Sequence, residues 1–304
     1  MHILKTALLC LLLLQTSIGF AKGCNQSKAD ALVFKANDIG VSGDIARQRG
    51  LLNAALKHCP SHPEALNNLG VLFENNGHFK QALDYYRKAL KARPDFSNAW
   101  LGIGDVYQKQ GQLPLALEAY LNACSKDDEA KEKVIKLLKN ERYRSVEAGQ
   151  VLNKASLLAL YDPSRHQAIL NKTKQCGFTT RLAVKTTGVF RNLHFQTGKA
   201  KVLKSSLPQL RQIASALQSL NRYVKIEGHS DKKPFRGRSQ AESDRLNRQL
   251  SLDRANAIKK VLVQQGISAR RIETQGYGPD RPLVLGNSEK AYAQNRRVEI
   301  SFQE

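Results

Sequence analysis

Apolar and small residues recur along the middle of the chain with a period of 34 residues. A period of this length is typical of a helix–turn–helix unit that buries its apolar face against neighbouring copies. We expect glycines to form the turns, small residues to let paired helices approach closely, and tyrosines to fill the space between units. The matching pairs are Gly70/Gly104, Gly77/Gly111, Ala82/Ala116, Tyr86/Tyr120 and Ala89/Ala123.

This pattern, closed in the first clear unit by Pro94, resembles the tetratricopeptide repeat family. A weaker unit precedes it over 29–60, with Ala36, Gly43 and Ala55 in register. Three units meet the usual minimum for a stable stack. The resemblance implies an all-α solenoid over residues 22–128 whose surface binds a protein or peptide. A purely structural spacer is the alternative.

Residues 129–188 are expected to form a helical cap and a connector. The charged segment 126–147 has Val134, Leu137 and Leu138 as its apolar stripe, which predicts a helix with a solvated outer face. A second short helix is expected over 149–160, and Asp162-Pro163 ends it. The pattern assigns no fold to residues 165–187.

Beyond residue 189, strand and helix periodicities alternate. Strands are expected over 190–195, 223–227, 271–274 and 297–302. Strands separated by helices of about 15 residues predict an α/β sandwich of the βαβαβ type, with helices packed on one mixed sheet. The helical positions are Leu203, Leu207, Leu210, Ile213, Leu217 and Leu220 in the first helix, and Ala255, Ile258, Val261 and Leu262, ended by Gly266, in the second.

The first 21 residues have the organisation of a secretory signal peptide. Lys5 precedes an apolar run over 7–14, and the small residue Ala21 offers a cleavage site. A retained anchor and a lipid on Cys24 are the alternatives, although the residues before Cys24 match a lipoprotein signal poorly. No later stretch reaches about 18 apolar residues, so no membrane span is expected in the mature chain.

Composition narrows the class of partner. The chain has 304 residues, of which 41% are hydrophobic and 24% charged, and this balance is that of a globular protein. The 48 Lys and Arg residues against 26 Asp and Glu give a net charge of +22, which indicates polyanions or anionic surfaces as partners. Nucleic acid is not expected, because the chain is exported and shows no RNA-binding motif or recognition helix.

Four cysteines remain after the expected cleavage: Cys24, Cys59, Cys124 and Cys176. An even number in an oxidising compartment allows two disulfides in three alternative pairings. A bond between Cys24 and Cys59, which would tie the mature N-terminus to the first helical pair, is one candidate. No CxxC motif and no zinc-like spacing occurs, so we expect neither a metal site nor a cofactor.

Candidate chemistry lies where a strand ends and a helix begins. The strand over 223–227 runs into Gly228-His229-Ser230-Asp231, and Ser251 is a good N-cap for the following helix. Such a cap places Arg254 in the first turn, where a cation opposes the helix dipole and therefore hints at a function. Helix-start amides and a guanidinium would receive a carboxylate, and Asp231 beside them would bind an ammonium. The sequence therefore predicts a site for a zwitterion such as the free end of an amino acid.

Four motifs in this order resemble the OmpA-like peptidoglycan-binding domain: GHSD at 228–231, NRQLSLDRA at 247–255, GYG at 276–278 and NRRVEI at 295–300. The resemblance covers residues 189–304. It implies non-covalent binding of the diaminopimelate in the peptide stem, with Asp231 and Arg254 gripping the zwitterionic centre. It also implies contacts from Asn247, Ser230 and Arg297. Ser230 stands where the family more commonly has Thr.

The stretch 232–246 is longer than in simpler members of the family. It is either a solvated loop or an electrostatic grip on an anionic polymer or surface. Two structural alternatives also stay open: a salt bridge between Asp231 and Arg254, and solvated edge charges at Arg296 and Arg297. The cations of the stretch are Lys232, Lys233, Arg236, Arg238 and Arg245.

Together these features predict a two-domain, non-enzymatic protein of the periplasm, associated with the cell wall or outer membrane. Its partners would be peptidoglycan at the C-terminal α/β domain and an unidentified protein on the repeats. A cell-wall hydrolase or a regulator of one is the alternative, although the sequence shows neither a paired carboxylate nor a zinc site.

Overall fold

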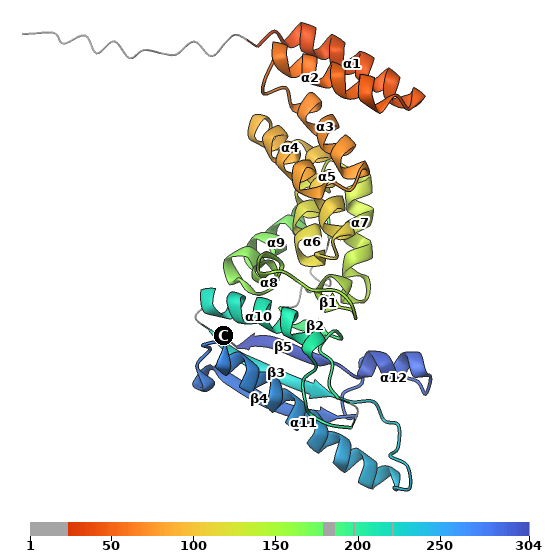
Figure 1. Ribbon diagram of the computed structural model, residues 1–304, viewed down its shortest axis with the longest axis vertical. Helices are drawn as coiled ribbons and strands as arrows, with labels where there is room; N and C mark the ends of the chain where they lie inside the picture. Colours follow the sequence, from red (N-terminus) through yellow and green to blue (C-terminus); the bar gives the residue numbers. More distant parts are fainter. Residues whose placement is uncertain (1–23, 179–185, 197, 221, 304) are drawn as a thin grey trace, which may run out of the picture.

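The structure is a computed structural model that describes residues 24–178, 186–196, 198–220 and 222–303. The expected signal peptide, residues 1–21, lies outside the described residues. Helices stack along the long axis in the N-terminal part, and a sheet with its own helices occupies the opposite end (Figure 1). An all-α region is thus followed by a mixed α/β domain, as the hydrophobic pattern predicts.

Three helical pairs form the repeat region, and each pair turns at a glycine. Gly43, Gly77 and Gly111 have φ values of 82°, 74° and 70°, in the left-handed region that favours glycine. The turns expected at Gly77 and Gly111 are confirmed, and so is the weaker first unit. The pairs are α1 (Gln26–Ser42) with α2 (Ile45–His58), α3 (Pro63–Asn75) with α4 (Phe79–Ala92), and α5 (Ser97–Lys109) with α6 (Leu113–Ala123).

Tyrosines pack against glycines inside the repeat region. Tyr86 in α4 is fully buried, and a Cβ at Gly70 of α3 would lie 2.6 Å from Cε1 of its ring. The same ring closes on Gly102 of α5, so it fills space within its own unit as well as towards the next. Its hydroxyl donates to Oε2 of Glu74 at 2.6 Å, and burial together with this carboxylate raises the pKa of Tyr86. The repeated glycines are therefore needed for the close approach of the rings.

The segment after the repeats contains more structure than the hydrophobic pattern predicts. The cap helix α7 (Asp128–Leu138) buries Val134, Leu137 and Leu138 as expected. The expected break at Asp162-Pro163 also occurs, because α8 ends there and Pro163 begins a further helix. That helix and a short strand were not predicted. The elements are η1 (Lys139–Arg144), β1 (Ser145–Val146), α8 (Lys154–Tyr161) and α9 (Pro163–Gln175).

The C-terminal domain is built on one mixed sheet of strand order β1-β2-β5-β3-β4. β3 runs parallel to β4 and antiparallel to β5, while β5 runs antiparallel to β2. Helix α11 packs on β3 and β4, and α10 packs against α11 and α8. The elements are β2 (Gly188–Phe190), η2 (Lys204–Ser206), α10 (Leu207–Ser219), β3 (Tyr223–His229), α11 (Gln240–Gln264), η3 (Ala269–Arg271), β4 (Ile272–Gly278), α12 (Glu289–Asn295) and β5 (Val298–Gln303).

One expected strand is wrong over most of its length. Strand β2 covers Gly188–Phe190, whereas the pattern placed the strand over 190–195. Phe195 makes only a single antiparallel bridge, to Val202. The chain leaves the sheet after Phe190 because the segment that follows turns back on itself to form the rim of a cavity described below.

Two disulfides close loops within the helical region. Cys24 is bonded to Cys59, which ties the residues before α1 to the end of α2. Cys124 is bonded to Cys176, which ties the end of α6 to the end of α9. Crosslinks of this kind stabilise a fold mainly by restricting the unfolded chain.

The helical region and the sheet share one hydrophobic core. A single cluster of buried side chains extends from Tyr120 and Val134 through Leu157 to Leu217 and Ile300. The Tyr161 hydroxyl at the end of α8 adds a hydrogen bond of 3.0 Å to the carbonyl of Ile300 in β5. Because no solvated layer separates the two regions, we expect them to unfold as one unit.

The single tryptophan, Trp100 in α5, packs against this cluster and therefore reports on the helical region. Ile226 in β3 is fully buried. Replacing it with Ala removes core packing and should lower the free energy of unfolding by about 2–5 kcal/mol. We expect Ile226→Ala to lower the unfolding midpoint that Trp100 fluorescence reports. Leu285→Ala, at a side chain that is 90% exposed, should leave the midpoint unchanged. An Ile226→Ala variant with an unaltered fluorescence transition would contradict the shared core.

Candidate functional site

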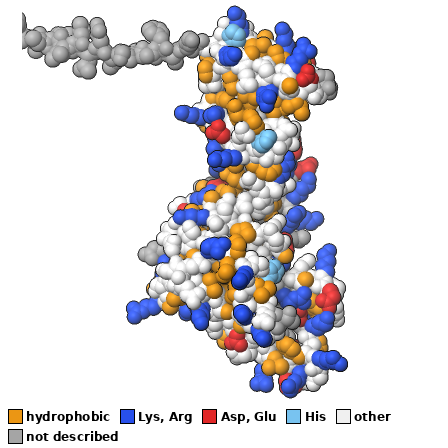
Figure 2. Space-filling model, viewed as in Figure 1, with side chains coloured by type: hydrophobic (Ala, Val, Ile, Leu, Met, Phe, Trp, Pro, Cys, Tyr) orange, Lys and Arg blue, Asp and Glu red, His pale blue; other side chains and the backbone are white. Residues whose placement is uncertain are grey.

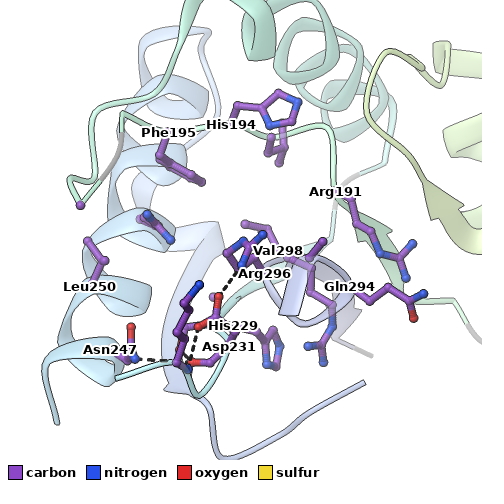
Figure 3. A pocket seen from close by; sticks show the side chains of 18 of the residues that line it. Arg191, His194, Phe195, His229, Asp231, Asn247, Leu250, Gln294, Arg296 and Val298 are labelled. Atoms are coloured by element: carbon purple, nitrogen blue, oxygen red, sulfur yellow. Dashed lines mark hydrogen bonds and ion pairs between the residues drawn. The ribbon is translucent and has the colours of Figure 1, made fainter. Parts of the chain in front are cut away.

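A cavity of about 780 Å³ opens at the carboxyl end of β3. One wall is the strand end itself, Gly228–Asp231, and a second is the face of α11 that carries Asn247, Leu250 and Arg254. The remaining walls come from α12 and the start of β5, from Arg191, residues 193–195 and Gly198 after β2, and from Glu147 and Ala148 after β1 (Figure 3). Ligands in sheets of this kind tend to bind at such strand ends.

All five residues expected to bind ligand line this one cavity: Ser230, Asp231, Asn247, Arg254 and Arg297. They come from three elements that are far apart in the sequence, and the fold brings them together. Their contacts divide them into two kinds. Asp231 and Arg254 present charge to the cavity, whereas the other three hold the surrounding chain in place, as described next.

The backbone at Asp231 is held by its two polar neighbours. Ser230 is buried, and its hydroxyl donates to the carbonyl oxygen of Asp231 at 2.9 Å. The Asn247 side-chain amide donates to the same carbonyl oxygen at 3.4 Å. The backbone N–H of Ser230 donates to the carbonyl of Gly278 at 2.9 Å, which fixes the strand end against β4. These contacts position the Asp231 carboxylate at the cavity wall.

The Asp231 carboxylate pairs with Arg296 and not with Arg254. Nη1 of Arg296 lies 2.6 Å from Oδ2 of Asp231, and the backbone N–H of Lys233 donates to Oδ1 at 2.9 Å (Figure 3). The side chain of Asp231 is only 13% exposed. Among the described side chains no ion pair joins Asp231 to Arg254, so the alternative of a simple salt bridge between these two residues is wrong. The sequence did not predict that Arg296 pairs with Asp231.

Arg254 is fixed by an aromatic ring and a backbone carbonyl. Its guanidinium carbon lies 5.1 Å from the centroid of the Phe195 ring, and Nε donates to the carbonyl of Lys199 at 3.3 Å. Burial lowers the pKa of Arg254, and the nearby Asp231 acts in the opposite direction. The described residues offer the Nη atoms no hydrogen-bond partner, so they are available to a carboxylate in the cavity.

Arg254 lies at a different position in its helix from the one expected. Helix α11 begins at Gln240 and not at residue 251, and its N-cap is Ser239, whose hydroxyl accepts from the backbone N–H of Glu242 at 3.2 Å. The Ser-x-x-Glu spacing at 239–242 is a capping-box signal that the sequence reading missed. Arg254 therefore lies in the helix interior, where there are no helix-start amides to bind an anion.

Ser251 is buried inside α11 because the helix crosses two strands there. Its hydroxyl donates to the carbonyl of Arg248 at 2.8 Å and accepts from the backbone N–H of Gly278 at 2.9 Å. A Cβ at Gly276 would lie 2.6 Å from Cβ of Leu252, and one at Gly228 would collide with the carbonyl of Ser251. The glycines of two motifs are thus explained by the close crossing of α11 over β3 and β4.

Arg297 is a buried structural side chain. Its guanidinium donates to Oε1 of Glu299 at 2.7 Å and to the carbonyls of Asn295 and Arg281. Burial lowers the pKa of Arg297, and Glu299 partly opposes that shift. The alternative of solvated edge charges is therefore wrong for Arg297. A direct contact of Arg297 with a ligand stays a prediction, because its donors already have these partners.

His229 is a buried residue of the cavity wall that the sequence reading did not single out. Only 4% of it is exposed, and neither ring nitrogen has a hydrogen-bond partner. Its ring stacks on Tyr277 with centroids 5.5 Å apart, and Nε2 lies 4.0 Å from Oε1 of Glu299. Burial, with Arg297 nearby, lowers the pKa of His229 to about 3, so the imidazole is neutral at pH 7. Its position between Gly228 and Ser230 in the GHSD motif was the available signal in the sequence.

The cavity carries an excess of positive charge. Of its lining residues, six are Lys or Arg and two, Glu147 and Asp231, are acidic. Such an imbalance attracts anionic groups. On the face that Figure 2 shows, Lys and Arg side chains extend along the entire molecule and are not gathered at one place. The cations of the cavity wall are Arg191, Lys233, Arg254, Lys290, Arg296 and Arg297.

The basic stretch 232–246 is only partly a loop. Residues 240–246 form the first turns of α11, while Pro234 and Phe235 line the cavity. The loop is pinned by a hydrogen bond of 2.9 Å from the backbone N–H of Phe235 to the Ser243 hydroxyl. Two of its five cations are paired, Lys233 with Glu289 and Arg238 with Glu242. The remaining three are Lys232, Arg236 and Arg245, for which the structure gives no ion pair within its described ranges.

Two features are absent from the described part of the chain. No group of three or more His, Cys, Asp or Glu side chains there is arranged to hold a metal ion. Within the same residues, no helix combines the length and apolar character needed to cross a membrane.

Two family models match the chain. Residues 194–296 match the OmpA family, and residues 63–96 match the tetratricopeptide repeat. The peptidoglycan-associated lipoprotein of Pseudomonas aeruginosa is 32% identical over 107 residues, which cover 35% of this chain and 59% of that protein. Outer membrane protein Omp38 of Acinetobacter baumannii is 34% identical over 106 residues, which cover 34% of this chain and 28% of that protein. The chain thus spans less than two thirds of these relatives.

Solved structures give a similar result. The peptidoglycan-associated lipoprotein from Burkholderia pseudomallei has 28% sequence identity, with 36% of this chain and 88% of that chain covered and a TM-score of 0.32. The cell wall anchor of the T6SS from Pseudomonas aeruginosa has 32% sequence identity, with 36% of this chain and 75% of that chain covered and a TM-score of 0.32.

The neutral buried state of His229 predicts a pH-dependent stability. Between pH 6.5 and about 3 the unfolded chain binds a proton at this residue and the folded chain does not, so the unfolding free energy falls as the pH falls. The limiting slope is about 1.4 kcal/mol per pH unit. We expect His229→Phe to lose this contribution, as measured by denaturant unfolding at pH 7, 6 and 5. The exposed His58, replaced by Gln, is the control. If the unfolding free energies of His229→Phe and the wild type changed with pH in parallel, the prediction would be contradicted.

Proposed function

We propose that this chain, which carries an OmpA-family domain over 194–296 and a tetratricopeptide repeat over 63–96, binds peptidoglycan non-covalently and presents its repeats to a protein partner. The observation that carries the proposal is the separation of opposite charges in one cavity. Asp231 is paired with Arg296, whereas Arg254 has no carboxylate partner among the described residues. A ligand with both an ammonium and a carboxylate matches this arrangement.

Diaminopimelate in the peptide stem is such a ligand. Its ammonium would approach the Asp231 carboxylate and its carboxylate the free Nη atoms of Arg254. Asn247 and Ser230 would act by holding the Asp231 backbone in place. Arg296 would give up part of its contact with Asp231 and turn its charge towards the ligand carboxylate. The exchange keeps every charged group paired, which limits the desolvation penalty of binding.

The relatives support the same conclusion. One of them is named a peptidoglycan-associated lipoprotein and another an outer membrane protein. In keeping with these names, we place the protein in the periplasm, in association with the cell wall or outer membrane. The proposed organisation is a signal peptide over 1–21, a repeat domain over 22–128, a helical cap and connector over 129–188 and the wall-binding domain over 189–304.

The cysteines support an oxidising compartment but a different attachment from that of the lipoproteins. Cys24 and Cys124 are each bonded to a second cysteine of the chain. A thiol in a disulfide cannot also carry a thioether-linked lipid. We therefore propose that Cys24 is a structural cysteine and that attachment to the wall depends on the cavity.

The repeat region would contribute a surface for a protein partner. Phe34 in α1 is 68% exposed and Val71 in α3 is also exposed, and apolar side chains of this kind favour protein contacts. Asn37 and Asn68 connect the same two helices through a hydrogen bond of 2.8 Å. Crosslinking in cells followed by mass spectrometry would identify the partner.

A hydrolase, or a regulator of one, is the alternative function. A glycosidase needs one carboxyl group free to donate a proton and a second nearby. The acids of the cavity wall, Asp231 and Glu147, are each engaged by an arginine. Release of dye from labelled peptidoglycan would reveal hydrolysis, and we expect none.

Sedimentation with purified sacculi tests the site. Asp231→Ala and Arg254→Ala should each lower the affinity about tenfold or more, because each removes a charge-assisted hydrogen bond to the ligand. Arg248→Ala is the matched control, since Arg248 is an exposed arginine of the same helix that pairs with Asp280. The loss should persist at moderate salt, which screens the exposed basic residues. A double variant that sediments as well as the wild type would refute the site.

Alkylation tests the role of Cys24. The mature protein from cell envelopes, treated with iodoacetamide without reduction, should show an intact mass with no acyl chain and no alkylated cysteine. After reduction, four cysteines should react. An acylated mass, or a free Cys24 thiol before reduction, would contradict the disulfide assignment.

A further inference from the structure

A second cavity, of about 720 Å³, lies between the helical region and the sheet domain. Its walls come from the start of α6, from η1 and β1, from β2, and from the chain around Leu283 and Val284. None of the residues predicted to bind diaminopimelate lines it. The residues of η1 and β1 precede the stretch 194–296 that matches the OmpA family model, so this chain builds the second cavity partly from its own connector.

The two cavities share a partition. Glu147, Arg191 and Gln294 line both. Figure 3 shows Arg191 and Gln294 at the end of the first cavity that lies away from Asn247 and Leu250. A ligand too long for the first cavity can therefore continue over these side chains into the second. A covalent polymer such as peptidoglycan is a ligand of this kind.

The charges of the second cavity favour a carboxylate. Arg142 is exposed, and its side chain has no hydrogen-bond or ionic partner among the described residues. Nε of Arg191 is buried and has no partner either, although Nη1 of the same side chain pairs with Glu147. The acids of the wall, Glu141 and Glu147, already pair with Arg144 and Arg191. An anionic group would pair with the unpartnered guanidinium of Arg142, and the positive charge of Arg191 would add to the attraction.

The walls of the second cavity are held rigidly. The backbone N–H of Arg191 donates to the carbonyl of Val146 at 2.8 Å, where β1 runs parallel to β2. The Asn192 side-chain amide donates to the carbonyl of Gln150 at 2.8 Å. From the helical region, the Gln112 amide donates to the carbonyl of Val151 at 2.8 Å. A preformed pocket of this kind loses little freedom when a ligand enters.

We propose that the second cavity binds the carboxylate of a neighbouring peptide that is crosslinked to the stem held in the first cavity. This inference rests on the proposed function, because it assumes diaminopimelate at Asp231 and Arg254. The exposed guanidinium of Arg142 receives the second carboxylate, and Arg191 adds its positive charge at the partition between the two cavities. Even a weak second contact raises the affinity for a linked ligand, since the covalent link keeps the second group at a high effective concentration. The protein thereby prefers crosslinked wall to loose stems.

Calorimetric titration of the mature chain tests this preference with three probes. These are diaminopimelate, a purified uncrosslinked muropeptide with a tetrapeptide stem, and the crosslinked dimer of that muropeptide. We expect the dimer to bind at least about tenfold tighter than the uncrosslinked form. Arg142→Ala should reduce this ratio to about one without altering the affinity for the other two probes, and Arg142→Lys should restore part of it.

Lys260→Ala is the control, because it removes one exposed cation of α11 that lines neither cavity. It should keep the full preference for the dimer. Equal affinities of the wild type for monomer and dimer, or a preference that survives Arg142→Ala, would overturn the second site while leaving the first intact. Absence of binding by all three probes would instead overturn the proposed function.

Discussion

The close crossing of α11 over β3 and β4 is the constraint on which the candidate site depends. Gly228 and Gly276 leave room for the helix backbone at this crossing, and the Ser251 hydroxyl joins the helix to the turn at Gly278. With the crossing fixed, Asn247 and Arg254 project from either side of it over the end of β3. A side chain at either strand glycine would push the helix outward and separate Arg254 from Asp231.

The electrostatics of the cavity follow from which charges are paired before a ligand arrives. Asp231 is paired with Arg296 and accepts a hydrogen bond from a backbone N–H, while Arg297 donates to Glu299 and to two carbonyls. Arg254 is held by a ring and one carbonyl, so its charge faces the cavity. In the proposed function, this arrangement favours an anion at Arg254 and lets a cation exchange with Arg296 at Asp231. Such exchange is less costly than exposing an unpaired buried charge.

The helical region and the α/β domain share one hydrophobic core. Their buried side chains belong to a single cluster, and the connector between them is hydrogen-bonded on one side to Gln112, the N-cap of α6, and on the other to Gln209 of α10. A molecule bound to the repeats would therefore be held at a defined position relative to the cavities of the α/β domain. The same connector contributes Glu147 to the partition between the two cavities, so the junction shapes both cavities as well as linking the two regions.

The sequence by itself determined the repeat turns, the β3, β4 and β5 strands and the five residues that meet in the cavity, because these depend on local periodicity or on short motifs. It did not determine that Ser251 is inside a helix, that 145–146 adds a strand, or that Arg296 pairs with Asp231. Each of these was decided by contacts between distant segments: the crossing of α11 satisfies the Ser251 hydroxyl, β2 gives a two-residue segment its partner, and the end of α12 brings Arg296 to the strand end. A serine, a short apolar pair and an arginine look the same in sequence whichever neighbour they meet, so only the tertiary structure could decide among their roles.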